Sequence, residues 1–394
     1  MDNKTKVGIV GTGFIATGVA HMIMQSNDFE LSWMFTRRPI DSIDAPSIPK
    51  RQLTNSLNQF IDDSDIVFEC SGDAIHAAEV IFEVAKTQKK IVTINSEFHV
   101  TAGSYFSRRG VYLTEADGDQ PGCLARLDQE VRGMGFQPLA YVNLKGFLNP
   151  DPTFEEMTYW SEKQKLALSQ VVSFTDGTKL QIEQSFVANG LGATIAKEGM
   201  IGATISKLED LDYLVDAARE KNAPISEYLL CPGSPPGVLI VADNPIADLC
   251  PGYLPFSRLR TTEDKAYILL RPYHLVHLES LNTLRRVVID DAILLNNSVS
   301  PRITVGAVAK KSMNPGEQIK HGAGGFDVRG KAVEIRHHPD AVPVCLLRNT
   351  PVIRHVAPGQ LITFDDVDLA QNRALECYLD SLTDYSVTKI SNCI

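Results

Sequence analysis

The chain has 394 residues, of which 22% are charged and 44% hydrophobic, and its formal net charge is −10. This composition is typical of a globular chain of two or three domains, and the acidic balance argues against nucleic acid or an acidic membrane as a partner. No apolar run is long enough to span a bilayer, and residues 1–6 lead directly into the first predicted strand, which leaves no room for a signal peptide. The seven scattered cysteines form no Cys-x-x-Cys pair, so we expect reduced thiols and a cytoplasmic protein.

The first motif joins a strand to a helix through a glycine-rich turn. Residues 6–20, KVGIVGTGFIATGVA, contain a β-branched run, the pattern G-x-G-x-x-A and then an apolar helical run. Gly11 permits the tight turn, Gly13 lets backbone N–H groups approach a pyrophosphate, and Ala16 lets the helix lie close to the strand. A purely structural glycine turn is the alternative, but this strand–turn–helix setting favours a dinucleotide site. The predicted cofactor contacts in this motif are Gly11, Gly13, Phe14 and Ile15.

The second predicted strand, residues 29–35, ends where a dinucleotide site commonly places an acidic residue for the adenosine ribose. Here the chain reads Thr36-Arg37-Arg38-Pro39 instead. A guanidinium pairs bidentately with phosphate, so we expect NADP(H) in preference to NAD(H), with Arg37 and Arg38 as contacts. The alternative is an ordinary solvated basic turn.

Further strands are predicted at residues 65–70, 90–94 and 111–114, with a helix at 75–85 between the first two. This alternation predicts an α/β fold with a Rossmann-type doubly wound parallel sheet. Ligands bind beyond the carboxyl ends of the strands in such sheets. We therefore place Ser71, Gly72, Asn95 and Glu97 near the cofactor.

An acidic loop follows the strand at 111–114. Residues 115–122 read EADGDQPG, so three carboxylates lie between glycines, and Asp119 is the candidate for proton handling. A polar site loop is one interpretation, and a solvated Asp/Gly-rich turn is the other.

Two lysines stand out in the middle of the chain. Lys145 follows a predicted strand at 139–144 and precedes Gly146 and Asn149, which suits an oxyanion or phosphate binder. Asp176-Gly177 is typical of a hairpin turn. If a helix begins near Thr178, Lys179 and Glu183 are one turn apart on one face, either as a surface ion pair or as part of a site that handles a proton.

The rest of the chain carries fewer signals of chemistry. Residues 209–221 predict an amphipathic helix, and 238–241 and 266–270 predict strands. From about residue 300 the pattern changes: residues 303–309 are alternating and apolar, and the segment as a whole favours a small β-rich appendage. We therefore predict three domains, namely a NAD(P)-binding domain at 1–140, an α+β catalytic domain at 141–300 and a β-rich domain at 301–394.

Several of these motifs together resemble a known family. The start GIVGTGFIATG, with FECSG (68–72) and VTIN (92–95), is similar to the cofactor domain of homoserine dehydrogenases. The segments GDQPG, NLKGFLNP, SFTDGTKLQIE and RPYHL resemble the DXR-like (DRL) oxidoreductases, and the tail LLRNTPVIRHVAPGQLITFDDVDL resembles a SAF domain. The resemblance covers nearly the whole chain.

The resemblance implies an NADPH-dependent oxidoreductase, and in the best-known members a reductoisomerase that converts 1-deoxy-D-xylulose 5-phosphate into 2-C-methyl-D-erythritol 4-phosphate. The positions that fall in segments matching the family's active-site region are Glu97, Asp119, Lys145, Asn149, Asp176, Lys179 and Glu183. One departure concerns Gln120, since those members have G-D-E-P where this chain has G-D-Q-P. Exchanging a carboxylate for an amide changes charge and metal affinity, which leaves the substrate and any divalent-metal requirement open.

We therefore expect an NADPH-linked reductase or dehydrogenase that acts on a small polar carbonyl or alcohol, phosphorylated or not, with homo-oligomerisation as the default for such enzymes. In this hypothesis Lys145 and Lys179 polarise the carbonyl or bind an anionic group, while Glu183 or Asp119 handles the proton. The residue types do not separate a reductoisomerase from a simple dehydrogenase of the homoserine type. A non-catalytic nucleotide-sensing protein, with the SAF-like tail contacting a partner, is the alternative from another class.

Overall fold

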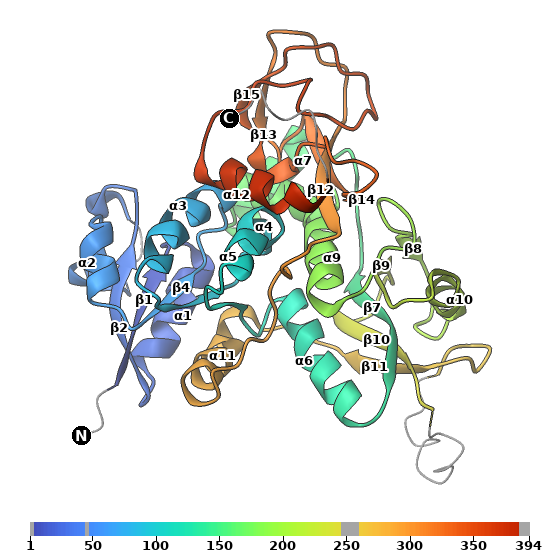
Figure 1. Cartoon of the computed structure of the whole chain (residues 1–394), viewed down its shortest axis with the longest axis horizontal. Coiled ribbons are helices and arrows are strands. Elements are labelled where there is room, and N and C mark those ends of the chain that lie inside the picture. The colour runs from blue at the N-terminus through green and yellow to red at the C-terminus, as the bar shows by residue number, and fades with distance from the viewer. Residues whose placement is uncertain (1–3, 44–46, 246–259, 386–394) are drawn as a thin grey trace. The chain divides into compact units, whose positions relative to one another are not determined.

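The computed structural model describes residues 4–43, 47–245 and 260–385, so Cys250 and Cys393 lie outside the described residues. The chain divides into two compact units, each assembled from separate segments. Unit 1 contains Met1–Gly122, Leu275–Val299 and Gln371–Ser381, and unit 2 contains Cys123–His274, Ser300–Ala370 and Leu382–Ile394. Figure 1 shows the elements of both units. This two-part division does not decide between the three predicted domains and other schemes, so the boundaries at 140/141 and 300/301 stay a prediction.

Unit 1 is built on a six-stranded sheet in which every neighbouring pair is parallel. The strand order is β3 (Leu53–Thr54), β2 (Phe29–Phe35), β1 (Thr5–Val10), β4 (Ile66–Glu69), β5 (Lys90–Thr93) and β6 (Leu113–Glu115). This order reverses direction at β1, as in doubly wound sheets. The predicted Rossmann-type α/β fold is confirmed.

Helices cover both faces of this sheet (Figure 1). On one face, α1 (Phe14–Met24) packs against α11 (Val276–Ile289), and on the other α3 (Ala74–Ala85) packs against α12 (Arg373–Ser381). Unit 1 also contains α2 (Leu57–Asp62) and the 3₁₀ turns η1 (Ile40–Ser42) and η2 (Lys50–Gln52). A further helical run is formed by α4 (Ser96–Phe98), the π-helical turn η3 (His99–Gly103) and α5 (Ser104–Arg108). Unit 1 is thus completed by two segments that are distant in sequence.

Packing explains why α11 belongs to unit 1. Leu284 and Val287 of α11 are buried in the same apolar core as Val19 and Ile23 of α1. The two helices approach closely at Gly18, where an added Cβ would lie 2.5 Å from Cγ of His277. A side chain at position 18 would therefore separate α1 from α11.

Unit 2 contains a five-stranded mixed sheet in the order β11 (Tyr267–Arg271), β10 (Gly237–Asp243), β7 (Gln137–Lys145), β9 (Ile225–Leu230) and β8 (Ala203–Thr204). The neighbouring strands β7, β9 and β8 pair in parallel, whereas β10 pairs antiparallel with both β7 and β11. One apolar core joins this sheet to α6 (Gln120–Gly133) and α9 (Thr178–Leu191), and a second joins its other face to α10 (Asp212–Lys221).

The helices α7 (Phe154–Gln164) and α8 (Leu168–Thr175) precede α9 and correct one expectation. The predicted hairpin turn at Asp176-Gly177 is wrong, because these residues form a corner between α8 and α9. Gly177 adopts the left-handed conformation at this corner, and the dipeptide suits such a corner as well as a hairpin.

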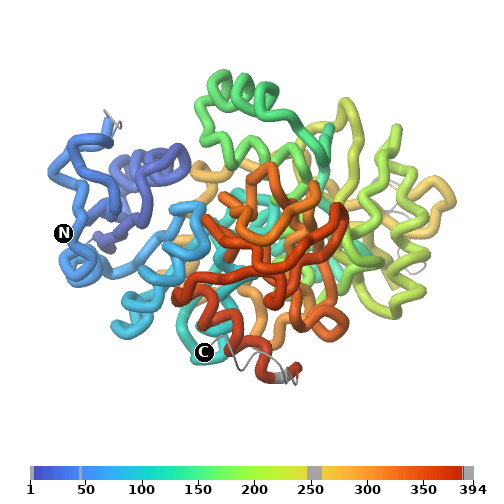
Figure 2. Tube along the Cα trace, turned by 90° about the horizontal axis from the view of Figure 1, so that it is seen from above, coloured from blue at the N-terminus to red at the C-terminus, as the bar shows by residue number. Residues whose placement is uncertain are grey.

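The C-terminal part of unit 2 is rich in strands, as expected. It contains the antiparallel pairs β12 (Ile303–Ala309) with β14 (Val328–Glu334) and β13 (Gln318–His321) with β15 (Arg348–Pro351), and a 3₁₀ turn η6 (Val344–Leu346). Both β12 and β14 pack on α9. Figure 2 shows these strands, coloured orange to red, gathered in one body. No described helix is both long and apolar enough to cross a membrane.

One buried carboxyl group supports a loop of unit 2. Glu227 on β9 is completely buried and accepts hydrogen bonds from the backbone N–H groups of Ile201 and Tyr228. Burial raises the pKa of Glu227 to about 7, although these hydrogen bonds oppose the shift. Folding therefore favours the protonated form of this side chain.

This shift predicts a pH-dependent contribution of Glu227 to stability. Below pH 4.5 the group is protonated in both the folded and the unfolded chain, and its contribution is complete. As the pH rises towards 7, the unfolded chain loses the proton first, so the free energy of unfolding falls, by roughly 3 kcal/mol in total. We expect Glu227→Gln to remove this fall when unfolding is followed in urea between pH 5 and 8. Glu130→Gln, at an exposed position of α6, should leave it, and parallel profiles for wild type and Glu227→Gln would contradict the prediction.

Candidate active site

The glycine-rich turn leaves the N-terminus of α1 open. Gly11 has φ +118, and an added Cβ there would lie 3.2 Å from the carbonyl oxygen of Cys70. Gly13 is the N-cap residue of α1 without a side-chain cap, and an added Cβ would meet no described atom within 4 Å. Of the two adjoining predicted contacts, Phe14 is 69% exposed and Ile15 is partly buried. The first N–H groups of α1 are therefore accessible to an anion.

Both predicted arginines lie at the carboxyl end of β2. A guanidinium nitrogen of Arg38 donates to Oγ1 of Thr12, within the glycine-rich turn, at 2.7 Å. Arg37 forms an ion pair with Asp73 at 3.0 Å, and Asp73 also caps α3. Arg38 is thus directed to the predicted phosphate site, whereas Arg37 has a carboxylate partner.

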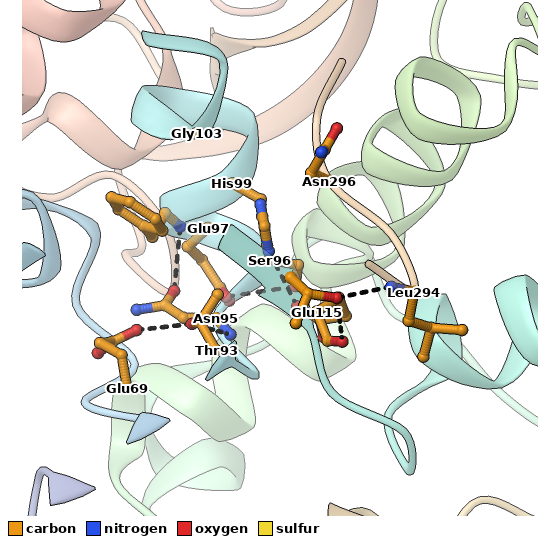
Figure 3. A network of polar contacts seen from close by, with 12 residues as sticks. Glu69, Thr93, Asn95, Ser96, Glu97, His99, Gly103, Glu115, Leu294 and Asn296 are labelled. Atoms are coloured by element: carbon orange, nitrogen blue, oxygen red, sulfur yellow. Dashed lines mark hydrogen bonds and ion pairs between the residues drawn. The ribbon is translucent and has the colours of Figure 1, made fainter. Parts of the chain in front are cut away.

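A buried carboxylate organises the adjoining ends of β4 and β5 (Figure 3). Glu69 is completely buried and accepts hydrogen bonds from the backbone N–H of Ser71 (2.7 Å), its hydroxyl (2.5 Å) and the hydroxyl of Thr93 (2.8 Å). Burial raises the pKa of Glu69 above its ordinary value, while these hydrogen bonds and the nearby Asn95 amide lower it. This arrangement fixes the loop that leads to Gly72.

Asn95 follows β5 in the same network. Its Oδ1 accepts a hydrogen bond from the backbone N–H of Phe98 at 3.0 Å and so caps α4. Its Nδ2 is buried and lies beside the Glu69 carboxyl group, whose pKa the Asn95 amide lowers. The side chain of Asn95 is therefore oriented by Glu69 on one side and by the start of α4 on the other.

The acidic residues of the neighbouring segments differ in exposure. Glu115 is completely buried and lies 3.3 Å from Nε2 of His99 (Figure 3), and burial lowers the pKa of His99 to about 3. Asp117 is buried and accepts a hydrogen bond from Thr283. Glu97 and Asp119 are only partly buried. The acidic loop at 115–122 is therefore not a solvated turn.

In unit 2, the helix α9 and the strand β7 place three polar side chains together. The side-chain amide of Asn143 donates to Oε2 of Glu183 at 2.8 Å, and Nζ of Lys179 lies 3.8 Å from Oε1 of Glu183. The side chains of Lys179 and Glu183 are 11% and 2% exposed, so the alternative of a surface ion pair is wrong. A buried ammonium is costly unless it has a negatively charged partner. The buried position of Lys179 therefore suits the binding of a negatively charged oxygen.

Two further predicted residues follow the same strand. Lys145 is the last residue of β7 and lies two positions after Asn143, so both start from the same face of the sheet. Asn149 donates its backbone N–H to the carbonyl of Thr175 at 2.8 Å, which ties its loop to the end of α8. Lys145 and Asn149 are both partly buried.

The structure thus gathers the predicted residues into two groups, which we describe separately. The group in unit 1 contains Gly11, Gly13, Arg38, Ser71, Gly72 and Asn95, and the group in unit 2 contains Lys145, Lys179 and Glu183. Their individual roles stay predictions. Sequence reasoning missed Glu69 and Asn143, although a polar residue inside an apolar strand was a usable signal at both positions.

The donor sets give no evident metal site. Among residues 4–43, 47–245 and 260–385, no three His, Cys, Asp or Glu side chains are grouped closely enough to hold an ion. Any divalent-metal requirement stays open.

The middle of the chain is similar to a known family of catalytic domains. Residues 118–280 match the family described as "Oxidoreductase DRL, catalytic domain". The chain is also 36% identical to the meso-diaminopimelate D-dehydrogenase of Lysinibacillus sphaericus over 74 residues, which are 19% of this chain and 23% of that enzyme. The similarity to an oxidoreductase catalytic domain therefore covers less than half of the chain, and the chain spans about a quarter of the length of the dehydrogenase that it matches.

Solved structures with a similar course of the chain include two dehydrogenases. One is a putative myo-inositol dehydrogenase from Sinorhizobium meliloti 1021, with 10% identity, a TM-score of 0.42 and coverage of 75% of this chain and 92% of that chain. Another is the homoserine dehydrogenase of S. aureus, with 14% identity, a TM-score of 0.30 and coverage of 47% and 50%. The resemblance of the C-terminal segment to a SAF domain stays a prediction.

Proposed function

We propose that this protein is an NADPH-dependent oxidoreductase that transfers a hydride between the nicotinamide and a small polar carbonyl or alcohol. The observation that carries this proposal is the uncapped N-terminus of α1 at Gly13, which follows the carboxyl end of β1 in the parallel sheet. An open helix N-terminus in this position suits a pyrophosphate. The family match of residues 118–280 supports the reaction class.

The preference for NADPH rests on Arg38. Its guanidinium is exposed and hydrogen-bonded to the glycine-rich turn, where a 2′-phosphate could replace or join the Thr12 hydroxyl as acceptor. No carboxylate stands at residues 36–38, where a ribose-binding acid would exclude the phosphate.

The chemistry assigned to the chain's own residues is polarisation and proton transfer. When bound, the nicotinamide supplies or accepts the hydride. In the direction of reduction, the ammonium of Lys179 or Lys145 stabilises the negative charge that develops on the carbonyl oxygen. The proton that accompanies the hydride then passes to this oxygen from Lys179, and Glu183, held by Asn143, keeps the lysine protonated and oriented. Glu97 and Asp119 are the partly exposed carboxylates proposed to contact the substrate.

The substrate class within this proposal is a small hydroxycarbonyl compound. The sequence resemblance favours 1-deoxy-D-xylulose 5-phosphate, with reductive isomerisation, as the first compound to test. Homoserine and other hydroxy acids come next, because a simple dehydrogenase needs the same hydride geometry.

The proposal predicts that the buried cluster controls turnover. With the first substrate that supports NADPH oxidation, we expect Lys179→Met, Glu183→Gln and Lys145→Met each to lower kcat by about 100-fold or more. Lys207→Met, at an exposed position of the same unit, should retain wild-type kcat. Undiminished turnover in the lysine variants would contradict their roles, and binding of NADPH without turnover over the whole panel would favour the nucleotide-sensing alternative.

The glycine-rich turn gives a prediction that separates cofactor binding from folding. Gly13→Ala adds a methyl group that meets no described protein atom, so we expect an unchanged midpoint of thermal unfolding but a Kd for NADPH raised by about 10-fold or more, since the methyl group occupies the space of the pyrophosphate. Gly11→Ala should instead lower the thermal midpoint, because its φ is +118. Fluorescence titration and thermal unfolding of both variants check this, and normal NADPH binding by Gly13→Ala would count against the proposed cofactor site.

Arg38 predicts the choice between the two nicotinamide cofactors. Loss of a charge-assisted hydrogen bond to phosphate should raise the Kd for NADPH of Arg38→Ala by roughly 10- to 100-fold. The Kd for NADH, which lacks this phosphate, should change by less than about 3-fold. Arg51→Ala, an exposed arginine of the same unit, is the matched control. Equal weakening of NADPH and NADH would show that Arg38 does not read the phosphate.

A further inference from the structure

The corner between α8 and α9 connects the two lysine-bearing segments of unit 2. Thr175, the last residue of α8, accepts a hydrogen bond from the backbone N–H of Asn149 at 2.8 Å. An added Cβ on Gly177 would contact Leu148 at 3.5 Å. The loop that leaves Lys145 therefore rests on this corner, and Lys179 lies only two residues after Gly177.

The C-terminal segment supplies a buried ion pair to the same corner. Nζ of Lys310, which directly follows β12, lies 2.6 Å from Oδ2 of Asp176, and the side chains are 6% and 0% exposed. Oδ1 of Asp176 accepts the backbone N–H of Thr178 at 2.9 Å, at the first residue of α9. Lys310 also donates to the carbonyl oxygen of Gly325 at 3.2 Å. One ammonium therefore joins the start of α9 to two parts of the C-terminal segment.

The same segment holds α9 along its length. Oγ1 of Thr178 accepts the backbone N–H of Gly330 at 2.9 Å, and Oε1 of Gln181 accepts the backbone N–H of Ala332 at 2.8 Å. Further along the helix, Asn189 exchanges hydrogen bonds with the backbone at the start of β12. These side chains occupy one stripe of α9, while Lys179 and Glu183 lie on another. The strands β12 and β14 thus hold α9 on the stripe that does not carry Lys179 and Glu183.

A second contact reinforces this arrangement. Gly324, in the loop between β13 and β14, has φ +78, and an added Cβ would lie 2.0 Å from the carbonyl oxygen of Ser169 in α8. The loop whose Gly325 carbonyl accepts the hydrogen bond from Lys310 therefore also packs directly against α8.

We propose that Lys310 is a positioning residue of the active site, which acts through Asp176 to hold the α8–α9 corner and with it the segments of Lys145 and Lys179. This inference rests on the proposed function, since it assigns the C-terminal segment a part in that reaction. A displacement of a reacting group by about 1 Å lowers a rate on the order of 100-fold, so loss of the Lys310–Asp176 pair affects kcat more than cofactor binding.

The test compares Lys310→Met and Lys310→Arg with Lys311→Met. Lys311 is the neighbouring lysine and pairs with Asp327 at 2.7 Å, but its side chain is 58% exposed. We expect Lys310→Met to lower kcat on the order of 100-fold with the Kd for NADPH within about 2-fold of wild type. Lys310→Arg, which keeps the charge, should recover most of kcat, and Lys311→Met should resemble wild type. Wild-type kcat per folded molecule of Lys310→Met would overturn the proposal, as would an equal loss of cofactor binding.

A double variant covers the case in which Lys310→Met fails to fold. Asp176→Asn with Lys310→Met removes both charges, so no unpaired buried charge remains. We expect this protein to fold with a thermal midpoint near that of wild type but to keep the low kcat. Recovery of kcat together with stability would show a merely structural pair and overturn the proposal.

Hydrogen exchange separates this inference from the proposed function. We expect the backbone amides of residues 178–183 to exchange faster in Lys310→Met or the double variant than in Lys311→Met, whether or not a substrate is known. Unchanged exchange there would overturn the positioning role. Absence of NADPH binding and turnover in the wild-type protein would refute the proposed function alone.

Discussion

The burial of a polar helix is the constraint on which unit 2 depends. Residues 178–189 of α9 are all buried, although they include Lys179, Gln181, Glu183 and Asn189. A polar side chain in such a place is costly unless it is hydrogen-bonded. Partners for several of these side chains come from β7, β9, β12 and β14. A helix in this position cannot shift without breaking several of these bonds at once.

This constraint also explains why unit 2 is not continuous in sequence. The partners of α9 come from segments on both sides of it, and the C-terminal strands β12 and β14 follow it by more than 100 residues. The backbone N–H groups of Gly330 and Ala332 in β14 donate to the side chains of Thr178 and Gln181, so two side chains of a helix satisfy the open edge of this strand. The C-terminal segment therefore packs directly against the helix of the candidate site and is not a separate appendage.

The parallel sheet of unit 1 could be predicted because its signals are local. Residues 29–35 were predicted as a strand with the bounds that the structure shows, since a short apolar and aromatic run between turn residues has few other interpretations. The packing of α11 on α1 had no such signal, because Gly18 and His277 are far apart in sequence. The same holds for Lys310 and Asp176. The hairpin at Asp176-Gly177 was wrong because an Asp-Gly pair also ends a helix, and only tertiary contacts decide between the two outcomes.

The polar residues inside apolar strands are the part of the site that sequence reasoning could have found. Glu69 ends a strand of otherwise apolar residues, and Asn143 lies between Val142 and Leu144. A strand tolerates such a residue only if something in the fold satisfies it. For Glu69 this is the loop of Ser71, and for Asn143 it is the carboxylate of Glu183. In both units a buried polar group thus fixes a segment that carries predicted site residues. The groups that would touch a ligand are therefore held in place by buried residues that would not touch it themselves.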